Sequence, residues 1–216
     1  MKQQDSGVKP ADPAASFVAE QSANRVFVLV LQHPRERKEP RATAAAAAAQ
    51  LRRARLVVGL SWPNLARALG RRAEPHRWGV LYLGSARPPA PTRHAPDRNG
   101  AIIVLGRDGE PVADPAPILK GIAGIVLLDG TWSEAKTLWW RNPWLLKLHR
   151  LVLNPAAPSR LGRLRREPRR EALSTLEAIA LVLREIEAGP ETGDALLAVL
   201  DRLVSAQRRP AAPQLT

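Results

Sequence analysis

Short runs of β-branched and other apolar residues, separated by alanine-rich or amphipathic stretches, recur along this 216-residue chain. Such runs are typical of strands buried on both faces of a parallel sheet, because the connecting helices cover both faces. The pattern therefore predicts an α/β fold with a mostly parallel sheet. The expected strands are residues 26–31, 56–60, 78–83, 102–105, 122–128 and 151–153.

The stretches between these runs predict helices at residues 43–53, 63–70, 133–140, 174–187 and about 192–206. The first four helices open at residues suited to a cap or a first turn, which are Thr43, Pro63, Thr131 or Ser133, and Ser174. The last helix is expected to pack on the outside of the domain through Leu196, Leu197, Leu200 and Leu203. The proline-rich residues 86–99 predict a loop.

The length suits one domain, which we place at residues 24–207 between flexible tails at 1–23 and 208–216. No apolar run approaches the roughly 20 residues that cross a bilayer, and residues 1–13 lack the apolar core of a signal peptide, so we expect a cytoplasmic protein. The absence of cysteine excludes a cysteine nucleophile and thiolate metal ligands. With the four histidines scattered, we expect no metal.

Basic residues dominate the charge, with 33 Lys and Arg against 20 Asp and Glu, a net charge of +13 and a pI of about 11.4. A protein that meets the phosphates of a nucleic acid has this charge balance. A GC-rich genome would also favour arginine, so charge alone does not identify the partner.

Polar residues follow three of the expected strands, at residues 32–36, 129–134 and from Asn154 to the helix start at Ser174. Ligand sites of open α/β sheets lie beyond the carboxyl ends of the strands. Helix starts there also offer N–H groups and a positive dipole to an anion. These three segments are therefore the candidate site.

The same segments carry a family resemblance. The sequence LDGTWSEA at residues 128–135 resembles the signature of the DTW-domain family, and QHPRE at residues 32–36 resembles its early histidine motif. Ser159, residues 164–165 and STLEA at residues 174–178 match its third block in order and spacing. Asn154-Pro155 and residues 173–178 are also similar to ribosomal-RNA aminocarboxypropyltransferases. The resemblance covers roughly residues 26–184.

The resemblance implies a SPOUT-like, knotted domain that transfers the 3-amino-3-carboxypropyl group of S-adenosylmethionine to N3 of a tRNA uridine and releases methylthioadenosine. It implies catalytic roles for Asp129, Thr131, Trp132, Glu36 and His33. The residues that it implies for donor binding are Gly130, Asn154, Pro155, Leu173, Ser174, Thr175, Glu177 and Arg165. The residues that it implies for RNA contact are Arg163, Arg166, Arg169 and Arg170. A monomer is the expected state, although the sequence does not fix it.

The proposed chemistry needs a base, because N3–H of uridine is a poor nucleophile until its proton is lost. Asp129, at a strand end, is the first candidate, and Glu36 or His33 is the reserve. The helix start at Ser174, with Arg165, suits the donor carboxylate. The ring face of Trp132 could contact the positively charged sulfonium arm of the donor.

This chain departs from the family pattern in two places. Many members carry an N-terminal set of cysteines that resembles a zinc-binding knuckle, and this chain has none. Arg160-Leu161 stands where an aromatic residue is common in the family. Metal-assisted tRNA docking and one stacking contact are therefore not expected here.

Simpler interpretations stay open for most of these residues. Residues 129–131 could form only a turn and a cap, and Ser174 and Thr175 could be plain caps. His33 could be structural, and Glu36 could pair with an arginine on the surface. Trp139, Trp140 and Trp144 fit packing, with RNA stacking as the alternative, and the arginines of residues 163–170 could be a solvated patch. A SPOUT-like methyltransferase and a non-catalytic RNA-binding protein remain alternative functions.

If the third-block arginines contact RNA, tRNA affinity should fall steeply with salt, because each neutralised phosphate releases counterions. Replacing Arg165, Arg166 and Arg169 by alanine should flatten the dependence of log affinity on log salt concentration. Filter binding of tRNA over a salt series measures this slope. A slope equal to that of the unmodified protein would place the RNA surface elsewhere.

Overall fold

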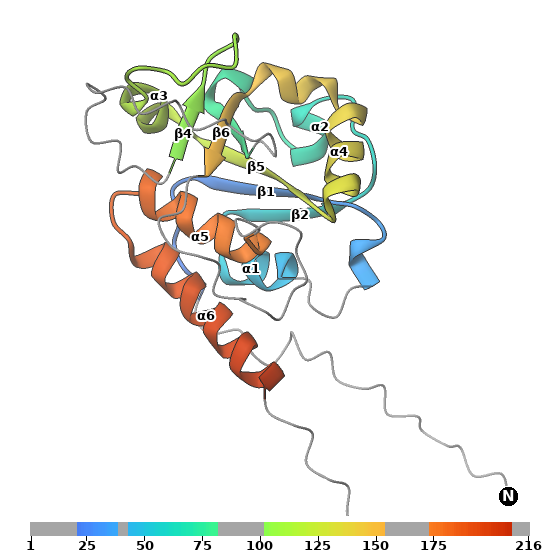
Figure 1. The fold of residues 1–216 in the computed structure, drawn as a ribbon, viewed down its shortest axis with the longest axis vertical. Helices are drawn as coiled ribbons and strands as arrows, with labels where there is room; N and C mark the ends of the chain where they lie inside the picture. Colours follow the sequence, from blue (N-terminus) through green and yellow to red (C-terminus); the bar gives the residue numbers. More distant parts are fainter. Residues whose placement is uncertain (1–20, 39–42, 82–101, 154–172, 209–216) are drawn as a thin grey trace, which may run out of the picture.

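The computed structural model describes residues 21–38, 43–81, 102–153 and 173–208, and these form an α/β domain (Figure 1). Its sheet has six strands in the order β2-β1-β5-β3-β6-β4, and every neighbouring pair is parallel except β4 and β6. The mostly parallel α/β fold is thus confirmed. The strands are β1 (Phe27–Gln32), β2 (Ala54–Val58), β3 (Trp78–Leu81), β4 (Ile102–Leu105), β5 (Gly124–Asp129) and β6 (His149–Leu153).

Of the helices in the described residues, five match the predicted ones, with shifted ends, and a sixth, α3, was not predicted. They are α1 (Ala44–Gln50), α2 (Leu65–Leu69), α3 (Ala116–Gly121), α4 (Trp132–Arg141), α5 (Thr175–Ile186) and α6 (Glu191–Arg208), with 3-10 turns η2 (Glu36–Lys38), η3 (Pro75–Arg77) and η4 (Pro143–Lys147). Asn64, rather than Pro63, caps α2, because its side chain accepts the Arg67 amide at 2.9 Å. The sequence did not predict α3, whose six residues are too few to show a helical period.

The predicted loop at residues 86–99 and most of the third block, residues 154–172, lie outside the described residues, as do most residues of both predicted tails. At the N-terminal boundary, Ser22 already belongs to the fold, since its amide donates to the Gln50 carbonyl at 2.8 Å. The SPOUT-like knot stays a prediction. Within the described ranges, no helix combines the length and apolar character that a bilayer crossing needs.

The sheet lies between two layers of helices, with α1, α5 and α6 on one face and α2 and α4 on the other (Figure 1). Strand alternation assigns the side chains to these faces. In β1, Val28 and Val30 pack toward α5, while Leu29 and Leu31 pack toward α4. Both faces are therefore buried, which explains the unbroken apolar runs of the sequence.

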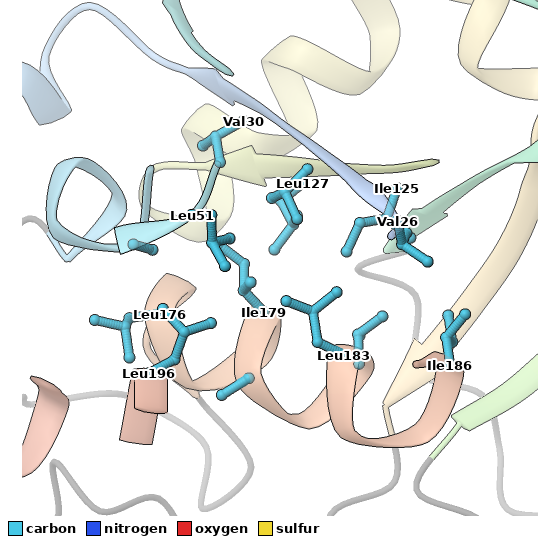
Figure 2. Packing of buried hydrophobic residues seen from close by; sticks show 14 of the residues in the cluster. Val26, Val30, Leu51, Ile125, Leu127, Leu176, Ile179, Leu183, Ile186 and Leu196 are labelled. Atoms are coloured by element: carbon cyan, nitrogen blue, oxygen red, sulfur yellow. The ribbon is translucent and has the colours of Figure 1, made fainter. Parts of the chain in front are cut away.

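The core on the α5 side joins the sheet to the last two helices (Figure 2). Val30 and Leu127 of the sheet face Ile179 and Leu183 of α5, and each of these four side chains is at most 3% exposed. Full burial of such a side chain stabilises the fold by about 1.5–3 kcal/mol. The predicted stripe of α6 is confirmed, since Leu196, Leu197 and Leu200 are buried and Leu203 packs against them.

A clamp fixes α5 at the opposite end of the sheet from the candidate site. The carboxylate of Glu187, which follows α5, accepts the amides of Val26 at 2.8 Å and Arg25 at 3.2 Å. The Arg25 guanidinium donates to the Ile122 and Ile186 carbonyls at 3.0 and 2.8 Å. The start of β1 therefore holds the end of α5.

A fully buried asparagine, Asn142, joins α4 to the loop between β2 and α2. Its Nδ2 donates to the carbonyls of Leu60 at 3.1 Å and Leu138 at 2.7 Å. Its Oδ1 accepts the amide of Trp62 at 2.8 Å and the indole N–H of Trp144 at 3.2 Å. One side chain thus satisfies four polar groups in the interior.

Asn142→Ala should lower the free energy of unfolding by about 2–4 kcal/mol, because it leaves several buried polar groups without partners. Urea denaturation measures the loss. The control is Asn64→Ala, which removes an exposed helix cap and should cost only about 1 kcal/mol. Equal losses in the two variants would show that the Asn142 bonds are worth no more than a cap.

Candidate functional site

The candidate site lies where β1 and β5 end side by side. Gln32 and Asp129 are register partners and the last residues of these two parallel strands. Alternation points both side chains toward α5, like Val30 and Leu127 two residues earlier. The Gln32 Nε2 donates to the Asp129 Oδ2 at 2.8 Å, and the two residues are only 3% and 4% exposed.

Helix α5 supplies a second partner for the same acid. The Thr175 hydroxyl donates to Oδ1 of Asp129. Among the described residues, each carboxylate oxygen therefore accepts one hydrogen bond, and the bonds come from two different elements. Burying a charged carboxylate is costly unless it is hydrogen-bonded, and these two side chains supply that compensation. Asp129 joins β5, β1 and the first turn of α5.

Two amides in the first turn of α5 are already bonded within the protein. The Ser174 hydroxyl accepts the Glu177 amide at 3.1 Å, so Ser174 is the predicted cap. The Thr43 hydroxyl accepts the Leu176 amide at 3.3 Å. Thr43 stands at the N-cap position of α1, as predicted, but its side chain makes no cap bond there and bonds to α5 instead.

The next residue of each strand leads to the other face of the sheet. His33 continues the ladder, since its amide donates to the Asp129 carbonyl at 2.9 Å. Its Nδ1 lies 3.4 Å from Oε1 of Glu134 on α4 and 3.3 Å from the Arg35 amide. Nδ1 accepts from Arg35 when unprotonated and donates to Glu134 when protonated. His33 is thus placed beside Asp129 through the backbone and beside α4 through its ring.

Thr131 and Glu134 form a capping box at the start of α4. Glu134 Oε2 accepts the Thr131 amide and hydroxyl, both at 2.9 Å, and Thr131 Oγ1 accepts the Glu134 amide at 3.4 Å. Burial raises the pKa of Glu134, but these bonds and the nearby charges of His33 and Arg35 outweigh burial, so the pKa lies below its ordinary value of 4.5. Thr131 therefore has a structural role in this arrangement.

Gly130 makes the close turn between β5 and α4 possible. Its φ is +153°, and a Cβ at this position would lie 2.9 Å from the Cβ of Glu134 and 3.3 Å from that of His33. Any larger residue would push α4 away from the strand end. The glycine of the signature is thus explained by packing.

The two remaining predicted catalytic residues, Glu36 and Trp132, lie at the starts of η2 and α4. Glu36 starts η2 and is 5% exposed, so the alternative that it lies on a solvated surface is wrong. Its amide donates to the His33 carbonyl at 3.0 Å. Trp132 is the first residue of α4 and is 48% exposed.

Of the predicted donor-binding residues, Gly130, Leu173, Ser174, Thr175 and Glu177 lie at the two helix starts beside Asp129. Glu177 is 4% exposed. The other predicted residues, Asn154, Pro155, Arg163, Arg165, Arg166, Arg169 and Arg170, lie outside the described residues. In the described part of the chain, no three His, Asp or Glu side chains form a group that could hold a metal ion.

Three residues of this arrangement received no role from the sequence: Gln32, Thr43 as a partner of α5, and Glu134. A signal existed for Glu134, because Thr131 and Glu134 have the Thr-x-x-Glu spacing of a capping box. Gln32 also had one, since it is a polar residue at the end of an apolar strand with the parity of Val28 and Val30. No local pattern connects Thr43 with α5.

Comparison with known proteins gives the following matches. A family model described as the DTW domain matches residues 14–208, which confirms the resemblance. A mouse (Mus musculus) protein named tRNA-uridine aminocarboxypropyltransferase 2 is 35% identical over 83 residues, covering 38% of this chain and 28% of that protein. The Macaca fascicularis protein of the same name is 32% identical over the same shares. The chain thus spans less than a third of these curated relatives, and no solved structure matches it.

Glu134→Gln keeps an oxygen for the Thr131 hydrogen bonds and removes the charge. Because the folded-state pKa of Glu134 lies below 4.5, its ionised form stabilises the fold above about pH 4.5 and this contribution is lost as the pH falls through the folded-state pKa. We expect the variant to be less stable by about 0.3–1 kcal/mol at neutral pH, as for an acid at a helix start. Urea denaturation from neutral pH to about pH 3 should show the difference vanish. A difference independent of pH would contradict the role of the charge.

Proposed function

Because this chain belongs to the DTW-domain family, we propose that it is a tRNA-uridine aminocarboxypropyltransferase with S-adenosylmethionine as donor. The curated relatives that share part of its sequence carry this activity in their names. The proposal includes a SPOUT-like knotted domain that acts as a monomer on tRNA in the cytoplasm. It requires no metal.

One observation supports the proposal most. A buried acid, Asp129, is held at the carboxyl edge of a parallel sheet by Gln32 and Thr175, between the starts of α4 and α5. Ligands of open α/β folds bind at this edge. Each oxygen of a carboxylate has two lone pairs, and among the described residues each Asp129 oxygen accepts one hydrogen bond, so capacity remains for a substrate proton.

In the proposed reaction, uridine N3 forms a bond to the γ-carbon of the aminocarboxypropyl group. The bond from that carbon to sulfur breaks, and methylthioadenosine leaves with its electrons. The N3 proton goes to a base, for which we propose Asp129, with Glu36 or His33 as the reserve. Bound S-adenosylmethionine supplies the electrophilic carbon next to its sulfonium.

The donor would lie against the helix starts at Gly130 and at residues 173–177, with Asn154, Pro155 and Arg165 completing its site. The bonds from the Leu176 and Glu177 amides to Thr43 and Ser174 leave less room for a carboxylate at α5 than the sequence suggested. We therefore assign the donor carboxylate chiefly to Arg165. The ring face of Trp132 would cover the sulfonium arm.

The decisive experiment is to incubate the purified protein with unmodified tRNA and S-adenosylmethionine. Mass spectrometry of the digested nucleosides should show uridine carrying the aminocarboxypropyl group, and the small-molecule product should be methylthioadenosine. Adenosylhomocysteine with a methylated nucleoside would instead identify a methyltransferase. Absence of both products with bound tRNA would leave a non-catalytic RNA-binding protein.

Asp129→Asn should keep the fold and nearly abolish transfer. The amide is almost isosteric, and the Gln32 amide can turn over to present its oxygen, so the link between β1 and β5 survives. Loss of a positioned base typically costs about 10²- to 10⁴-fold in rate, which single-turnover kinetics measure.

Donor affinity of the same variant, measured by calorimetry, separates two roles. Unchanged affinity supports a base, whereas weaker binding indicates that Asp129 holds the donor ammonium group. The control is Asp108→Asn, which makes the same change in an exposed turn near β4 and should leave rate and affinity unaltered. Wild-type rate and affinity for Asp129→Asn would reduce Asp129 to a turn residue.

A further inference from the structure

The outer face of α4 carries a shallow hollow, and the proposed chemistry uses only Trp132 of its lining residues. Its volume is about 390 Å³, and its lining residues are Trp132, Ser133, Lys136, Thr137, Trp140 and Arg141. Residues four apart lie on one line along a helix, so Trp132, Lys136 and Trp140 form one row and the other three form the next. The opposite face of α4 is buried through Ala135 and Leu138.

Trp140 is 75% exposed, although it is the largest kind of apolar side chain. The packing interpretation fits Trp144, which is buried, and Trp139, which packs partly buried against the core, but it does not fit Trp140. Trp140 shares the hollow with Trp132, which is 48% exposed, so the two rings form one exposed aromatic patch, and such patches indicate a binding surface.

The charge of the hollow selects the class of partner. Among the described residues, its only ionisable side chains are Lys136 and Arg141, which are both exposed, and neither forms an ion pair with a carboxylate of those residues. The nearest acid along the helix, Glu134, is bonded to Thr131 and faces His33. Lysine is depleted at protein interfaces, whereas aromatic rings with basic neighbours are the usual platform for unpaired nucleotides.

The hollow also begins at the candidate site. Trp132 follows Asp129 by three residues, and Trp140 lies two helical turns further, roughly 12 Å away at 1.5 Å per residue. An RNA strand whose uridine reaches Asp129 could therefore continue along α4.

We propose that this face of α4 binds unpaired nucleotides of the RNA that flank the target uridine. A base stacks on the ring of Trp140, and Lys136 and Arg141 lie at the phosphates. The inference rests on the proposed function for the identity of the RNA. It adds a docking surface made of described residues to the arginines of the third block.

The test is fluorescence anisotropy with a labelled single-stranded, uridine-rich RNA and with a fully paired RNA stem, in the absence of donor. Trp140→Ala should weaken binding of the single strand by about 5- to 100-fold, the range expected for one lost stacked base. Trp140→Phe should restore most of the affinity, because a smaller ring still stacks. Lys136→Ala should lower the salt slope by about 0.7, the value for one phosphate of a single strand.

Matched controls come from exposed residues outside the hollow. Leu146 is 67% exposed, so Leu146→Ala removes apolar surface without touching the hollow. Lys120→Ala removes a charge from α3. Both should bind RNA as the unmodified protein does. Equal loss in Trp140→Ala and Leu146→Ala, or an unmodified protein that does not bind the single strand, would overturn the proposal.

These outcomes separate the surface from the reaction. If RNA binding depends on Trp140 but no product forms, the proposed function is refuted and the proposed RNA-binding surface stands. If the Trp140→Ala variant forms product and its RNA affinity and reaction rate are unchanged, the proposed RNA-binding surface is refuted and the proposed function stands. Preference for the paired stem would replace stacking by backbone contact and also overturn the proposal.

Discussion

The in-register parallel pairing of β1 with β5 is the constraint on which the candidate site depends. It places Gln32 opposite Asp129 and directs both toward α5. A shift of one residue would turn Asp129 toward α4 and an apolar side chain toward Thr175. The many buried apolar side chains on both faces of the sheet oppose such a shift, so the hydrophobic core fixes the position of the acid.

The strand end divides its polar groups between the two faces of the sheet. On one face, Asp129 is held by Gln32 and Thr175; on the other, Glu134 is held by Thr131 and approached by His33. The backbone bond from the His33 amide to the Asp129 carbonyl lies between them. Helices α5 and α4 are therefore each anchored at their first turn to the same pair of strands, and both helix starts border one small region.

The sequence was enough to predict the sheet, the main helices and the segments of the site, because apolar runs and helix caps are local patterns. The capping box of Thr131 and Glu134 was also accessible from spacing. The partner of Asp129 on β1 and the partner of α5 near α1 were not, because the bond from Gln32 to Asp129 spans 97 positions and the bond from the Leu176 amide to Thr43 spans 133. Such pairs follow from strand order and register, which no single segment encodes.

The strand order has a consequence for how the chain folds. β1 precedes its inner neighbour β5 by almost 100 residues, and the helix that covers both comes later still. Contacts between such distant segments slow folding, because the loop-closure entropy is lost before the contacts form. During synthesis, β1 therefore emerges before its central partner, and its unpaired apolar edge is exposed to aggregation until β5 follows.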